Sequence, residues 1–107
     1  MLSSPIRLGP SLLVDLPRCV IIRETTDVAL EGRDVRLLET LLQDPRCYIS
    51  IETLAKAVMV PADYENSADR SQCVYDAVWS VRRKLGPLGS SILKSKQGRG
   101  YAICPQS

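Results

Sequence analysis

Short apolar runs alternate with turn residues along the first part of the chain. The runs cover residues 6–8, 11–16, 19–23 and 28–30, and Gly9-Pro10, Pro17-Arg18 and the polar residues 24–27 separate them. Runs this short suit strands better than helices, and short polar connections suit turns between antiparallel neighbours. The pattern therefore predicts an antiparallel sheet over about residues 5–31.

After residue 31 the apolar spacing changes to that of helices. A first helix is expected over about residues 32–43, because one face carries Val35, Leu38, Leu41 and Leu42. Its N-cap is not evident, since no Ser or Thr stands at residues 31–33, and Pro45 ends it. Ser50 then suits the N-cap of a second helix, which Pro61 closes.

The third helix, at about residues 70–85, has the clearest pattern. An apolar stripe at i, i+4, i+7 and i+11 is formed by Val74, Val78, Val81 and Leu85. Asp69 or Ser71 is the expected cap, and Gly86-Pro87 the expected end. Cations of the last turn, Arg82, Arg83 and Lys84, suit the helix dipole.

Residues 91–104 read as a β-hairpin, because Gln97-Gly98-Arg99-Gly100 lies between two strand-like runs. Three helices followed by a hairpin are typical of a winged helix-turn-helix, whose last helix enters the major groove of DNA. We therefore expect an α+β fold in a single domain over residues 1–107. The sheet would occupy about 5–31, the helices 32–85 and the wing 91–104.

Charge is distributed unevenly along the chain. Residues 1–66 hold 7 Lys/Arg and 10 Asp/Glu, a net charge of −3, whereas residues 67–107 hold 7 Lys/Arg and 2 Asp/Glu, a net charge of +5. A polyanionic partner for the C-terminal part is the functional interpretation, and an ordinary solvated surface is the alternative. No apolar run approaches the roughly 18 residues of a membrane span, and no signal-like segment stands at Met1, so we expect a cytoplasmic domain without membrane contact.

The residues that usually carry catalysis or bind zinc are scarce. The chain has no His, and Cys19, Cys47, Cys73 and Cys104 lack the close spacing of a zinc site. Free buried thiols are expected, with two disulfides in a secreted domain as the alternative. No nucleophile–base pair and no Gly-rich phosphate loop is found, so we expect no enzyme, cofactor or metal.

Several segments resemble one family, the OmpR/PhoB-type winged-helix effector domain. They are residues 8–15, 28–39 and 50–54, the segment Val78-Trp79-Ser80-Val81-Arg82-Arg83-Lys84-Leu85, and Gln97-Gly98-Arg99-Gly100-Tyr101. The resemblance implies a four-stranded sheet, three helices and a wing in a bacterial transcription regulator that binds double-stranded promoter DNA, often as a dimer. Members of the family usually carry a separate receiver or sensor. The chain is therefore expected to be the cytoplasmic part of a larger regulator of one-component or two-component signalling, with a stand-alone effector as the alternative.

Candidate DNA-binding residues follow from the helix and the hairpin. Opposite the apolar stripe we place Gln72, Cys73, Asp76, Ala77 and Ser80, and the resemblance puts them in the groove. Gln72 would bond adenine, Ala77 and Cys73 would touch a thymine methyl, and Ser80 would bond a base or phosphate. Arg82, Arg83 and Lys84 would pair with phosphates. In the wing, over residues 94–101, the candidates are Lys94, Lys96, Gln97, Arg99 and Tyr101, the last packing the wing with its hydroxyl near a phosphate.

The sequence also departs from the family at this surface. Many members have Arg-Thr at Gln72-Cys73, His at Ala77, Arg at Gln97 and Trp at Met59, and Asp76 adds a negative charge. The alternative function is therefore a winged-helix protein–protein interaction module with weak or no DNA binding. Its partner would be RNA polymerase, through the loop of residues 59–69, or a second copy of the chain. Trp79 would either touch DNA or lie on the domain surface.

Overall fold

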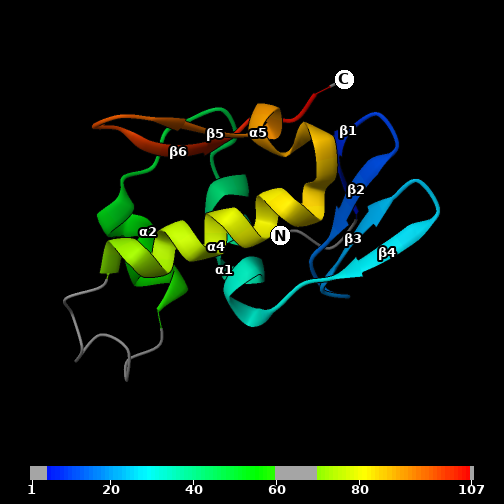
Figure 1. Cartoon of the computed structure of the whole chain (residues 1–107), viewed down its shortest axis with the longest axis horizontal. Helices are drawn as coiled ribbons and strands as arrows, with labels where there is room; N and C mark the ends of the chain where they lie inside the picture. Colours follow the sequence, from blue (N-terminus) through cyan, green and yellow to red (C-terminus); the bar gives the residue numbers. More distant parts are fainter. Residues whose placement is uncertain (1–4, 60–69, 107) are drawn as a thin grey trace.

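The computed structural model describes residues 5–59 and 70–106, with the side chain of Arg70 left out. A four-stranded sheet lies at one end, helices form the middle, and a hairpin extends over the other end (Figure 1). The strands are β1 (Ile6–Gly9), β2 (Leu12–Asp15), β3 (Val20–Arg23) and β4 (Thr26–Ala29), antiparallel in the order β1-β2-β3-β4. The predicted N-terminal antiparallel sheet is confirmed.

The sheet register explains which of its residues are buried. Val14, Ile21 and Val28 are paired across three strands, so their side chains leave the same face of the sheet. Val14 and Ile21 are fully buried there. The predicted turn over residues 24–27 is too long, because Thr26 already pairs with Arg23. A two-residue turn suffices, since Glu24 adopts a φ of 55°.

Three helices follow as predicted, namely α1 (Gly32–Leu42), α2 (Ile51–Val58) and α4 (Arg70–Leu85). The cap that the sequence did not identify at α1 is an acidic one, since the Glu31 N–H donates to Asp34 Oδ2 at 3.0 Å. At α2 the predicted cap is confirmed, as Ser50 Oγ accepts from the Thr53 N–H at 3.2 Å. Ser71 is already inside α4, so it is not the cap, and Asp69 and Pro61 lie outside the described residues.

The connection from α4 to the hairpin is helical. Gly86, with a φ of 83°, ends α4 and begins the short helix η2 (Gly86–Leu88), which α5 (Gly89–Ile92) continues. The hairpin, hereafter the wing, consists of β5 (Leu93–Lys96) and β6 (Gly100–Ile103). The predicted first strand therefore started two residues too early, at Ser91 instead of Leu93.

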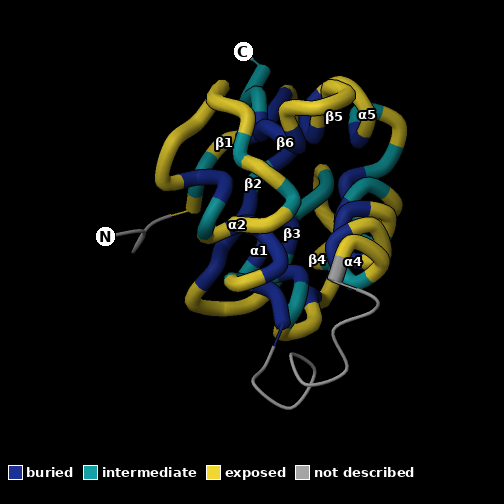
Figure 2. Tube along the Cα trace, turned by 90° about the vertical axis from the view of Figure 1, so that its left-hand side faces the viewer, coloured by how far each residue is buried: buried dark blue, intermediate teal, exposed yellow. Residues whose placement is uncertain are grey.

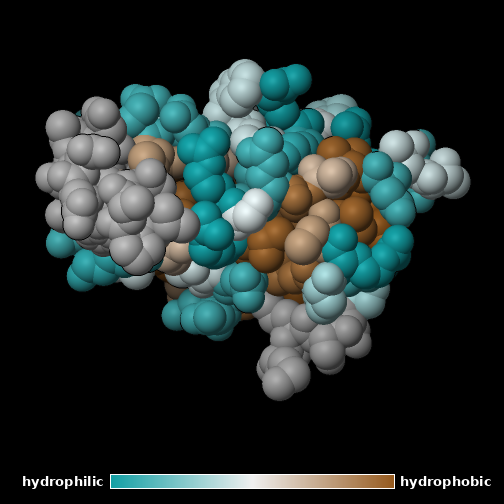
Figure 3. Space-filling model, turned by 90° about the horizontal axis from the view of Figure 1, so that it is seen from below, coloured by the Kyte–Doolittle hydropathy of each residue, from teal (hydrophilic) through white to brown (hydrophobic). Residues whose placement is uncertain are grey.

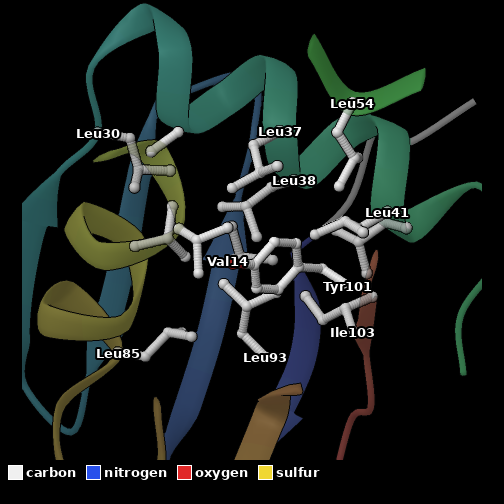
Figure 4. Packing of buried hydrophobic residues seen from close by; sticks show 14 of the residues in the cluster. Val14, Leu30, Leu37, Leu38, Leu41, Leu54, Leu85, Leu93, Tyr101 and Ile103 are labelled. Carbon is white, nitrogen blue, oxygen red and sulfur yellow. The ribbon is translucent and has the colours of Figure 1, made fainter. Parts of the chain in front are cut away.

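One hydrophobic core joins the sheet, the helices and the wing. Leu37, Leu38 and Leu41 of α1 are fully buried, and the cluster includes Val14 of the sheet, Leu54 of α2, Leu85 of α4, and Leu93 and Ile103 of the wing (Figure 4). Burial alternates along the helices, so that α4 turns one side outward (Figure 2). Seen from below, apolar surface gathers toward the sheet end (Figure 3). Within residues 5–59 and 70–106, no helix is long and apolar enough to cross a membrane.

Candidate nucleic-acid interface

Helix α4 has one buried side and one exposed side. Val74, Ala77, Val78, Val81 and Leu85 are in the core. On the opposite side Gln72, Asp76, Trp79 and Arg83 are exposed, at i, i+4, i+7 and i+11. At about 100° per residue these four lie within about 60° of one another around the helix, and they are hereafter called the recognition face.

Two predicted groove residues lie away from this face. Ala77 is 0% exposed, so its expected contact with a thymine methyl is wrong. It follows Val74 by three residues, which places it beside the apolar stripe, and that spacing was the signal available in the sequence. Cys73 is half-buried against the core and Ser80 is half-buried, whereas Gln72 and Asp76 are fully on the exposed side.

Arg82 contacts the wing. Its Nε and Nη2 donate to the carbonyl oxygen of Leu93 at 3.0 and 2.7 Å. The Cys104 N–H donates to Ile92 O, so the next carbonyl along β5 points away from β6, toward Arg82. One donor edge of the guanidinium is thus occupied by a bond between α4 and β5, a role that the sequence prediction of a phosphate ligand at Arg82 did not foresee.

Tyr101 is part of the core. Its side chain is only 9% exposed, and its ring lies among Leu38, Leu41 and Leu93 (Figure 4). Burial raises the pKa of its hydroxyl above the ordinary value, and the charge of Arg82, whose guanidinium carbon lies 5.8 Å from the ring centre, partly offsets this. The prediction that Tyr101 packs the wing is confirmed, whereas a DNA contact through its hydroxyl is not supported.

Lys84 is also used inside the domain. Its ammonium group pairs with Asp34, whose side chain is 1% exposed, while that of Lys84 is 21% exposed. The pair joins the end of α4 to the start of α1. Lys84 is therefore not free to bind a phosphate, in contrast to the sequence interpretation.

The wing tip leaves its polar side chains in solvent. The four DNA-binding candidates Lys94, Lys96, Gln97 and Arg99 are exposed, and the Arg99 N–H closes the turn on Lys96 O at 3.0 Å. Gly100 is required where β6 starts, because a Cβ there would lie 1.9 Å from Ile49 O and its φ is 105°. The main chains of Ile49 and Tyr101 exchange two hydrogen bonds at this point, of 2.7 and 3.0 Å.

A groove separates the wing from α4. It is lined by residues of the wing tip, by Ser50 and Ile51 at the start of α2, and by Tyr75 of α4. Tyr75 is 44% exposed, and sequence reasoning passed over it. The exposed indole of Trp79, 62% accessible, lies beside Arg83, whose guanidinium carbon is 4.7 Å from the ring centre. Among the described side chains of α4 and the wing tip, the exposed cations are Arg83, Lys94, Lys96 and Arg99.

The arrangement of exposed cations on α4 and the wing tip suits the binding of a polyanion better than catalysis. Across the described part of the chain no group of three or more His, Cys, Asp or Glu side chains is placed to hold a metal ion. Cys19 and Cys47 are exposed free thiols, and Cys73 and Cys104 are half-buried ones, so the expected free cysteines are confirmed but not all of them are buried.

Comparison with known proteins identifies similar domains. The family model described as "Transcriptional regulatory protein, C terminal" matches residues 25–103. Among solved structures, a mutant of RitR is 28% identical with a TM-score of 0.66 over 91% of this chain, which spans only 42% of that protein. The DNA-binding domain of CpxR from E. coli is 23% identical with a TM-score of 0.69, covering 98% of this chain and 100% of that one. The DNA-binding domain of E. coli CadC is 21% identical, with a TM-score of 0.65 and coverages of 94% and 92%. A comparison with curated proteins gave no significant match.

Proposed function

Because the chain belongs to the family of C-terminal domains of transcriptional regulatory proteins, we propose that it binds double-stranded promoter DNA in a sequence-specific manner. The family is one of bacterial DNA-binding regulators and not of enzymes, and the fold is its winged helix. In the proposed complex α4 enters the major groove with its recognition face, and the part of the wing at residues 94–101 contacts the flanking backbone or minor groove.

The observation that carries this proposal is the pairing of an exposed helix face with a basic wing tip that is fixed to the same helix. The wing is bonded to α4 through Arg82 and to the chain before α2 through Ile49. Its tip is therefore presented at a set position relative to α4. Arg83 would bind phosphate from the helix, and Lys94, Lys96 and Arg99 would do so from the wing.

Salt dependence tests the proposal directly. Four cations are exposed among the described side chains of α4 and the wing, namely Arg83, Lys94, Lys96 and Arg99. They predict that the logarithm of the binding constant for a random duplex falls with the logarithm of salt concentration at a slope of about −3.6. Fluorescence anisotropy of a labelled duplex measures this slope. Each cation changed to Ala is expected to reduce its magnitude by about 0.9.

The control is an exposed cation at the sheet end. Arg7 lies on β1, and Arg7→Ala is expected to leave the slope unchanged. If the unmodified domain shows no binding to duplex DNA even at low salt, the proposed function is wrong for this domain.

One observation favours the second candidate function, a protein–protein interaction module. The recognition face contains the exposed indole of Trp79, a residue type enriched at protein–protein interfaces, and a carboxylate, Asp76, that the phosphates of DNA would repel. A partner bound with no dependence on salt, together with no DNA binding, would support this alternative. Contact with RNA polymerase through residues 59–69 and pairing of two copies on DNA stay proposals, and residues 60–69 of that loop lie outside the described part of the chain.

A further inference from the structure

We propose that α4 selects a cytosine in the major groove through the carboxylate of Asp76, and that Gln72 positions this carboxylate. The inference rests on the proposed DNA binding and adds the base that one residue reads. It begins from the placement of Asp76 in the N-terminal half of α4, the half of a recognition helix that contacts base edges.

The side chains of Gln72 and Asp76 are bonded to each other on the recognition face. Gln72 Nε2 donates to Asp76 Oδ1 at 2.9 Å, four residues along the helix. A carboxylate has no hydrogen to give, so the amide nitrogen must face it and the amide oxygen of Gln72 must point away. Among the described residues Asp76 Oδ2 has no hydrogen-bond partner. The pair therefore turns chiefly acceptor oxygens toward whatever enters this face.

An acceptor of this kind discriminates among the four base edges. In the major groove guanine presents two acceptors, and thymine presents one acceptor and a methyl group. Adenine presents an amino donor next to the acceptor N7, a pattern that suits a side chain able both to donate and to accept. Cytosine presents its N4 amino group without a neighbouring acceptor on the same base, so a carboxylate fits cytosine best.

The position of Arg83, the cation of the recognition face, is compatible with a contact between Asp76 and cytosine. Arg83 follows Asp76 by seven residues on the same face, which is a distance of about 10 Å along the helix axis. The major groove is about 12 Å wide, so Arg83 can reach a phosphate at its edge while Asp76 lies among the bases. Because a carboxylate is repelled by the phosphates, Asp76 lowers overall affinity and contributes selectivity.

A selection from a randomised duplex pool tests the inference, with the unmodified domain, Asp76→Ala and Asp76→Asn carried through in parallel at one salt concentration. The domain is expected to enrich a motif with one fixed cytosine, and replacing that cytosine by thymine should weaken binding about tenfold or more. Asp76→Ala should lose the preference at this position alone and bind random duplex more tightly. Asp76→Asn should shift the position toward adenine, since an amide can pair with both N6 and N7.

The matched control is another exposed carboxylate, Glu39 on α1, and Glu39→Ala should return the unmodified motif. Equal melting temperatures of the variants show that all of them are folded. If Asp76→Ala enriches the same motif with the same cytosine preference, the inference is overturned while the proposed function stands. If the unmodified domain enriches no sequence and binds no duplex, the proposed function itself fails.

Discussion

Replacing either of two neighbouring arginines of α4 by Ala should change a different property of the domain. Arg82 donates two hydrogen bonds to Leu93 O, whereas Arg83 is exposed and its guanidinium carbon lies 4.7 Å from the centre of the Trp79 ring. We expect Arg82→Ala to lower the stability of the fold and Arg83→Ala to lower the affinity for DNA. Side chains of the same type at adjacent positions make the comparison internally controlled.

The magnitude for Arg82→Ala follows from the bond that is lost. A hydrogen bond to a charged group contributes about 2 kcal/mol, and the Leu93 carbonyl would lose its partner on the edge of β5. For 107 residues the entropy of unfolding is about 0.22 kcal/mol/K, so the melting temperature should fall by about 9 °C. Arg83→Ala removes an exposed cation–π contact of about 0.5 kcal/mol, which corresponds to about 2 °C.

Thermal unfolding followed by circular dichroism measures the first effect, and the salt slope of DNA binding measures the second. Arg83→Ala should reduce the magnitude of the slope by about 0.9, and Arg82→Ala should leave it unchanged. Equal melting temperatures for the two variants would refute the assignment of Arg82 to the wing. A reduced slope for Arg82→Ala would show that this guanidinium binds phosphate after all.

Three further outcomes follow from contacts elsewhere in the fold. Gly100→Ala should lower the free energy of unfolding by about 3 kcal/mol or more, because the new Cβ would lie 1.9 Å from a carbonyl oxygen. Gly98→Ala should lower it by about 1 kcal/mol, because a Cβ there meets open space and only the φ of 79° is unfavourable. Equal urea midpoints for the two variants would contradict this. Asp34→Ala should cost about 3 kcal/mol in the same assay, since it leaves a half-buried lysine without its partner, and an unchanged midpoint would argue against the pair. The hydrogen bond and negative charge of Asp44 raise the pKa of the Cys47 thiol, so the reactive thiolate forms only at higher pH. Asp44→Asn should therefore speed the labelling of Cys47 by iodoacetamide at pH 8. An unchanged rate would show that Asp44 does not raise the pKa of this thiol.

Periodicity predicted most of the fold, and its errors have local causes. The stripe of Val74, Val78, Val81 and Leu85 placed α4 correctly, because core packing decides both the pattern and the helix. The strand at Ser91 was wrong because α5 is only four residues long, too short to show a period. The early start of β4 was missed because Thr26 and Asp27 are polar and exposed, so nothing in their hydropathy distinguishes a strand from a turn.

The site was harder to predict, because residue type does not reveal a side chain's partner. Arg82, Arg83 and Lys84 read as one basic cluster in the sequence, yet consecutive residues of a helix point about 100° apart. The structure accordingly gives them three surroundings, namely the Leu93 carbonyl, the exposed ring of Trp79 and the Asp34 carboxylate. Leu93 and Asp34 each lie more than ten residues along the chain from the cation that they bind, so only the folded structure could identify them as its partners.

The way the wing is attached determines how DNA binding should respond to mutation. An isolated two-stranded hairpin is only marginally stable in water, so this one depends on its contacts with the rest of the domain. Those contacts include the Ile49–Tyr101 main-chain bonds, the Arg46 N–H bond to Ile103 O, the Arg82–Leu93 bond and the burial of Tyr101, and none of these uses the tip residues Lys96 and Arg99. Since the contacts hold the strands before DNA arrives, little binding energy is spent on ordering the hairpin. Substitutions at the attachment residues should therefore weaken binding at an unchanged salt slope, whereas substitutions at Lys96 or Arg99 should reduce the slope itself, because these tip residues, unlike the attachment residues, displace counterions from the phosphates.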